Sequence, residues 1–142
     1  MKNKLPYIIA LVFALLALIF AGLWVHEKNK KTELTELLCE NSIKESFEHF
    51  TAYKMEEADE EYWYGVADYN AFMKSYILLC DGENQSDRIE MNRAYGSMVI
   101  APNDVKSNMD KLLEALELLS NDIYDSSAII KLTEFNNALE HK

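Results

Sequence analysis

Three consecutive aromatic residues, Tyr62, Trp63 and Tyr64, form the most chemically distinctive stretch of the sequence, with acids at residues 59–61 before them and Asp68 after them. Aromatic faces attract cations, and nearby carboxylates strengthen that attraction, so these residue types suit a cage for an amine. The alternative is that the rings form the core and rim of a helical bundle. Adjacent helical residues point about 100° apart, so we expect Tyr62 or Tyr64 at the surface, where it would contact a partner.

Two cysteines, Cys39 and Cys80, are the candidates for redox chemistry. If the chain reverses near residues 59–60, facing residues of two antiparallel helices have numbers that sum to about 120, and the two thiols lie level. A disulfide there would close a loop of about 40 residues and contribute roughly 4 kcal/mol in the chain-entropy model. The alternatives are two reduced thiols packed as small apolar side chains, or a bend at Gly65 that separates them.

Residues suited to catalysis or metal binding do not form a recognisable motif. His49 follows Glu45 by one helical turn, but the H-E-x-x-H and E-x-x-H patterns are absent, so a contact between helices is expected for His49. The glycines are isolated, and no G-x-S-x-G elbow is present. We therefore expect no enzyme, no cofactor and no metal.

The charge of the chain is strongly asymmetric. All 24 acids but only 12 of the 14 Lys and Arg residues follow His26, which leaves that part with a net charge of −12. Such a charge repels nucleic acid backbones, so we expect no nucleic acid partner. It favours solubility and attracts cations or basic partners.

The 21 residues Leu5–Val25 carry no charge. As a helix they would be about 32 Å long, which matches the hydrocarbon core of a bilayer. A cleaved signal peptide has a shorter apolar core, and cleavage after Ala21 would place Ile19 where a small residue belongs. We therefore predict a short basic tail at residues 1–4, a transmembrane helix at residues 5–25 and a basic juxtamembrane segment at residues 26–31.

Orientation and self-association follow from the flanks and one face of this helix. Lysines flank it almost evenly, but the basic N-terminus is typical of an export signal, so we expect a cytoplasmic N-terminus and an extracytoplasmic domain. Small residues spaced four, three and four apart suit close helix packing in lipid and predict a possible homodimer face. These residues are Ala10, Ala14, Ala17 and Ala21.

Apolar residues at helical spacing recur through residues 32–142, and no stretch alternates as a strand does. The pattern predicts an all-α fold in which one transmembrane helix precedes an acidic bundle of four or five helices. The expected helices cover residues 32–58, 61–80, 87–100, 105–123 and 128–139. The first apolar stripe is expected to bury Leu34, Leu38, Cys39, Ile43, Phe47, Phe50 and Tyr53.

These features together favour a single-pass protein of the cell membrane that acts by binding another protein. The alternative is an extracytoplasmic sensor that holds a small cationic ligand in the acidic and aromatic patch of Tyr62, Trp63, Tyr64 and Asp68.

Overall fold

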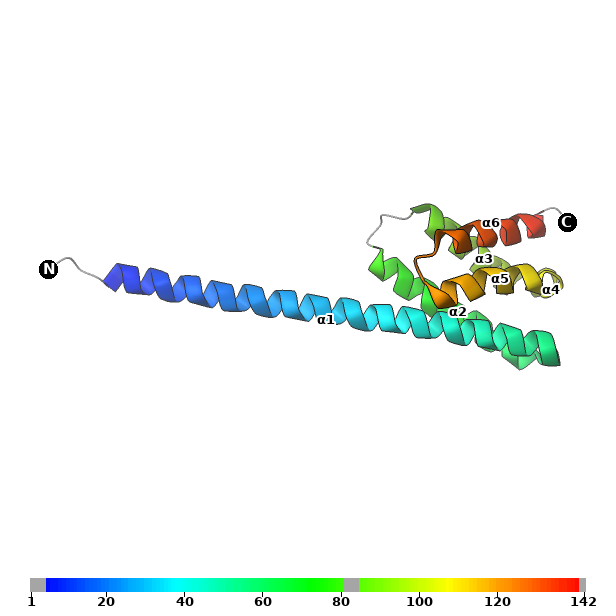
Figure 1. Cartoon of the computed structure of the whole chain (residues 1–142), viewed down its shortest axis with the longest axis horizontal. Helices are drawn as coiled ribbons and strands as arrows, with labels where there is room; N and C mark the ends of the chain where they lie inside the picture. Colours follow the sequence, from blue (N-terminus) through cyan, green and yellow to red (C-terminus); the bar gives the residue numbers. More distant parts are fainter. Residues whose placement is uncertain (1–4, 81–84, 141–142) are drawn as a thin grey trace. The chain divides into compact units, whose positions relative to one another are not determined.

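The computed structural model describes the backbone of residues 5–80 and 85–140 and the side chains from residue 11 onward within those ranges. These residues form six helices and no strand, which confirms the all-α prediction (Figure 1). The helices are α1 (Leu5–Glu56), α2 (Asp59–Leu79), α3 (Gln85–Ile100), α4 (Pro102–Ser107), α5 (Met109–Asn121) and α6 (Ser126–Glu140). The predicted basic tail at residues 1–4 lies outside the described residues.

The chain divides into two compact units, residues 1–34 and residues 35–142, with the boundary inside α1. In the first unit, the large apolar side chains from Leu11 to Val25 are 45–70% exposed. Among the described residues, one helix near the N-terminus is long and apolar enough to cross a bilayer, and none of its apolar window is buried. Ala14, Ala17 and Ala21 are exposed too, and the side chain of Ala10 lies outside the described residues.

The second unit has its own apolar core. Within it, α6 packs against α3 and α5, and α3 packs against α2 (Figure 1). The second part of α1 buries Cys39, Ile43 and Phe50, as its apolar spacing predicts. Leu34 and Leu38 were expected in the same stripe but are more than half exposed, so the buried stripe of α1 begins only at Cys39.

The reversal between α1 and α2 lies at Glu57 and Ala58, slightly earlier than the predicted 59–60. Phe50 consequently lies against Gly65, where an added Cβ would be 3.0 Å from the phenylalanine ring. The predicted register placed Phe50 at the Tyr69–Asn70 level, so that register is wrong. The Ser46 hydroxyl donates a 2.9 Å hydrogen bond to the Gly65 carbonyl, which satisfies a polar group at this close helix contact.

The apolar stripe predicted as one helix over residues 105–123 is divided into α4 and α5. Pro102 occupies the first turn of α4, where its missing N–H costs nothing. Asn108 interrupts the helix, and its amide side chain donates to the Asp104 carbonyl at 2.8 Å. Val105 and Met109 are nevertheless both buried. The apolar spacing therefore identified the buried face correctly but did not reveal the break.

Candidate functional site

The start of α2 positions the predicted aromatic and acidic site. Glu57 adopts a left-handed backbone conformation with φ of 53°, which ends α1 and reverses the chain. The residues that follow place three acids in the first turn of α2, where the helix dipole favours negative charge. The reversal brings this turn against the last turns of α1.

The three consecutive aromatic residues point in different directions, as their helical spacing requires. Tyr62 is completely buried, whereas Trp63 is 47% exposed and Tyr64 is 54% exposed. This confirms the prediction that one of the two tyrosines reaches the surface. Trp63 and Tyr64 are therefore the rings available to a partner.

The side chain of Tyr62 is enclosed by other residues of the chain. Its hydroxyl donates a 2.9 Å hydrogen bond to the Met98 carbonyl. Its ring packs edge-on against Phe50 at 5.6 Å and Tyr53 at 5.5 Å between ring centroids. Burial raises the pKa of the Tyr62 hydroxyl well above its usual value, so this group stays neutral. Tyr62 thus anchors α2 to α1 and α3 and is closed to an outside ligand.

Lys106 of α4 lies against part of the predicted aromatic and acidic cage, at Tyr62 and Asp59. The Lys106 ammonium lies 5.0 Å from the ring centroids of both Tyr53 and Tyr62. It also donates to the Asp59 carboxylate, a hydrogen bond that raises the pKa of the ammonium and keeps it charged. At Tyr62 and Asp59, the contacts predicted for an external amine are therefore made by a lysine of the chain itself. Lys106 is separated from Asp59 by 47 residues, and no local sequence signal pairs them.

Beside the exposed ring of Tyr64, a histidine bridges α1 and α2. The His49 Nδ1 atom lies 2.6 Å from a Glu61 oxygen, and its Nε2 atom lies 3.5 Å from an Asp68 oxygen. The Tyr64 ring centroid is 5.5 Å from that of His49. This confirms the predicted contact between helices for His49. Both ring nitrogens face carboxylates, and both can donate only when the imidazole is protonated.

Asp68, the fourth predicted site residue, is partly buried next to this histidine. Burial raises the pKa of the Asp68 carboxyl, with a smaller opposing effect from His49 and a further rise from Glu45. Asp68 is therefore part of the α1–α2 contact. It borders the surface of Tyr64 through their shared neighbour His49.

The two cysteines are free thiols in the structure. Cys39 is buried and its Sγ atom lies 3.8 Å from the Phe72 carbonyl, eight residues before Cys80 along α2. Burial, with the nearby Cys80 and acids, raises the pKa of the Cys39 thiol to about 12. A disulfide between them stays a prediction, and at neutral pH the Cys39 thiol is a poor nucleophile.

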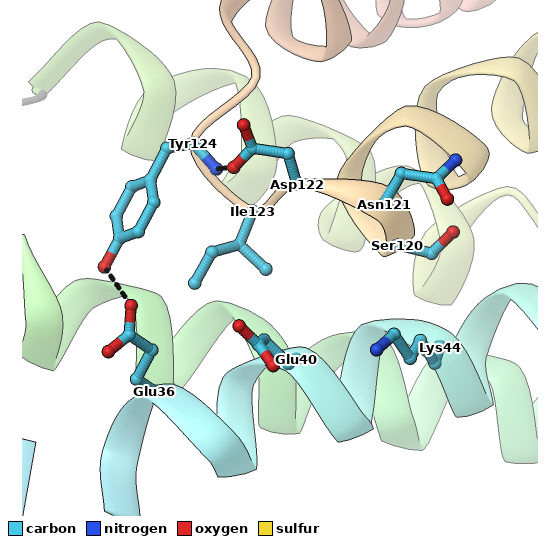
Figure 2. Close-up of a pocket in the computed structure, with 8 residues that line it drawn as sticks. All are labelled: Glu36, Glu40, Lys44, Ser120, Asn121, Asp122, Ile123 and Tyr124. Atoms are coloured by element: carbon cyan, nitrogen blue, oxygen red, sulfur yellow. Dashed lines mark hydrogen bonds between the residues drawn. The ribbon is translucent and has the colours of Figure 1, made fainter. Parts of the chain in front are cut away.

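A hollow of about 260 Å³ lies where α1 faces the end of α5 and the segment that follows it. Figure 2 shows Glu36, Glu40 and Lys44 on α1 opposite the chain from Ser120 to Tyr124. The Tyr124 hydroxyl donates to Glu36 at 3.5 Å and closes one end. Sequence reasoning missed this hollow, because its two sides are separated by more than 70 residues and neither carries a motif.

Among the described residues, no group of three or more His, Cys, Asp or Glu side chains is placed to hold a metal ion. A scan against protein-family models, a search of curated proteins and a search of solved structures each found no match to this chain. Function is therefore inferred from the residues and their geometry.

Proposed function

We propose that this chain is a single-pass membrane protein whose acidic helical bundle binds another protein, with the Trp63–Tyr64 surface as a contact. The membrane part rests on the uncharged stretch Leu5–Val25 and on the exposure of the apolar residues of that stretch that are described, none of which is buried. A helix that is apolar on all sides belongs in a protein core or in lipid. We propose lipid, with the N-terminus in the cytoplasm and the bundle outside.

The observation that carries the binding role is the exposure of two large aromatic rings on an otherwise acidic helix start. Trp and Tyr are the residue types that contribute most to protein–protein binding energy. Trp63 and Tyr64 are about half exposed even though Tyr62 between α1 and α3 is fully buried. The helical step turns both rings away from the core face that Tyr62 occupies, so they are accessible to a partner.

The alternative of a small cationic ligand loses support at Tyr62 and Asp59. Lys106 occupies the faces of Tyr53 and Tyr62 and pairs with Asp59. An amine ligand would have to displace a covalently attached, charge-paired ammonium. A thermal-shift screen with amines at millimolar concentration tests this alternative, and stabilisation by an amine would restore it.

Site-specific photo-cross-linking in native membranes tests the binding role. A photoreactive phenylalanine analogue replaces Tyr64 in the full-length chain, and the same analogue replaces exposed Ile130 on α6 as the matched control. We expect a discrete cross-linked protein from position 64 that is absent from position 130 and is lost when Trp63→Ala is added. Identical products from both positions, or none from position 64, would contradict the proposal.

Labelling with a membrane-impermeant maleimide tests the orientation. Cys39 is buried, so a reporter is better placed at Met55, which is 75% exposed. We expect intact cells to label the Met55→Cys variant above the background of the unaltered chain. Labelling only after the membrane is permeabilised would reverse the orientation.

A further inference from the structure

A groove with an apolar floor and an acidic rim runs between α1 and α5, and we call it the α1–α5 groove. Its larger part is a hollow of about 680 Å³. The hollow of Figure 2 continues the same seam toward the end of α5. Facing positions run antiparallel, from Glu36 opposite Tyr124 to Lys54 opposite Asp110. The distance from Glu36 to Lys54 along α1 is about 27 Å, the length of an 18-residue helix.

The floor of the groove is apolar at its larger hollow. Phe47 of α1 and Leu113 of α5 are partly buried and pack against the core. Met55, at the same hollow, is 75% exposed. An exposed methionine beside partly buried apolar residues is typical of surfaces that accept an apolar helix face. The floor therefore offers apolar contact that the bundle itself leaves unused.

The rim of the groove is acidic. The residues that line the two hollows include six carboxylates and two lysines. Lys54 pairs with Asp110, and Lys131 lies 3.2 Å from Glu114. No ion pair to the Glu117 side chain is present among the described residues. The rim thus keeps an excess of negative charge that a basic partner would neutralise.

We propose that the α1–α5 groove binds an amphipathic helix of a partner protein, with the apolar face of that helix on Phe47, Met55 and Leu113 and its basic flank against the acidic rim. The groove is long and open, which suits a helix rather than a small cation. A second copy of this chain would bring another unit of net charge −12 and is disfavoured by repulsion. The inference rests on the proposed binding role but uses a different surface from Trp63–Tyr64.

A designed peptide tests the groove with the full-length chain in nanodiscs of zwitterionic phosphatidylcholine. The probe is a fluorescent 18-residue helix with leucine on one face and lysine on the other. The first control peptide has the same composition with leucine distributed around the helix, and the second has glutamate in place of lysine. We expect saturable anisotropy changes with the probe, at least tenfold weaker binding of either control, and no binding to empty nanodiscs. Equal binding of the probe and the rearranged peptide would overturn the proposal.

Matched variants locate the binding. Glu117→Lys is expected to weaken probe binding about fivefold, whereas Glu60→Lys on α2 leaves it unchanged. Met55→Glu separates docking from simple charge attraction, because it adds a negative charge but removes apolar contact. Docking in the groove predicts binding about tenfold weaker in Met55→Glu. Stronger binding in that variant, or equal losses in Glu117→Lys and Glu60→Lys, would show nonspecific electrostatics and overturn the proposal.

The experiments distinguish failure of the groove proposal from failure of the proposed aromatic contact. Trp63→Ala is expected to abolish cross-linking from position 64 and to leave probe binding unchanged. Probe binding that depends on Trp63 would overturn the assignment to the groove. A probe that binds normally while position 64 gives no cross-link would support the groove and contradict the aromatic contact.

Discussion

The two parts of α1 use similar residue types in opposite ways. From Leu11 to Val25, large apolar side chains occupy every side of the helix and remain 45–70% exposed. From Cys39 to Phe50, apolar residues occupy one stripe and are buried against the rest of the bundle, while the other sides are polar. An apolar stripe can be covered by neighbouring helices, but a helix that is apolar all round needs lipid or a complete protein shell. The comparison predicts that the first part depends on the bilayer and the second on its own core.

Charged substitutions in the first part should have the largest effect. Leu15→Arg combined with Leu18→Arg places two cations in the predicted hydrocarbon core, at an insertion cost of about 2.5–3.5 kcal/mol each. We expect the double variant to move from the membrane fraction to the soluble or degraded fraction in carbonate extraction. The control pair Leu15→Ile and Leu18→Ile should stay in the membrane. A double-arginine variant that is retained as firmly as this control would remove the basis for the comparison.

A matched pair of phenylalanine truncations compares the two parts directly. Phe50→Ala should lower the free energy of unfolding of the bundle by about 3–5 kcal/mol. The reason is that the Phe50 side chain of α1 is completely buried and packs against α2. Phe20→Ala removes the same atoms from a side chain that is 67% exposed and should leave bundle stability unchanged. Chemical denaturation of both variants in nanodiscs, followed by circular dichroism, measures the difference. Equal losses would mean that the apolar stretch contributes to the bundle core.

Helical periodicity was sufficient to predict the fold class and most buried positions. The acids at residues 59–61 indicated the start of α2, because negative charge favours a helix N-terminus. Apolar spacing could not reveal the break at Asn108, since Val105 and Met109 remain on the buried face on both sides of it. It also could not show where burial along α1 begins, because that depends on which helices are present to cover Leu38.

The candidate site was predictable only in part. The 100° helical step meant that the three rings could not all face the core, and Trp63 and Tyr64 are the two that reach the surface. The cation found at Tyr62 and Asp59 is Lys106, which lies 47 residues after Asp59 in another helix. Long-range contacts of this kind depend on the turn between α1 and α2 and on the path through α3. The error in the α1–α2 register shows how a small shift of the turn changes every facing pair.

Alanine substitutions at two glycines allow a close helix contact to be compared with an open helix face. Gly65 has no room for a methyl group, since an added Cβ would lie 3.0–3.1 Å from Phe50 ring atoms. Gly65→Ala should therefore destabilise the bundle by about 1–3 kcal/mol through overpacking. An added Cβ at Gly96 meets nothing within 4 Å, so Gly96→Ala should stabilise it by about 0.5–1 kcal/mol through helix propensity. Opposite shifts in the denaturation midpoint are expected, and shifts of the same sign would contradict the helix contact.

The smallest expected effect concerns Asp68, which lies at the edge of the buried α1–α2 contact. Its carboxyl pKa is raised from 3.8, mainly by burial, although His49 lowers it and Glu45 raises it further. The folded protein therefore holds a proton on Asp68 that the unfolded chain releases near pH 3.8. The stability associated with that proton is present below pH 3.8 and is lost as the pH rises through the folded value.

Asp68→Asn removes this titration and keeps an oxygen that can accept from His49. Relative to Asp68→Asn, the unaltered protein should lose stability over the window that starts below pH 3.8 and ends above the raised folded pKa of Asp68. Denaturation of both proteins across this window gives the difference directly. A difference that is constant with pH, or that favours the unaltered protein as the pH rises, would show that the His49 contact outweighs burial at Asp68.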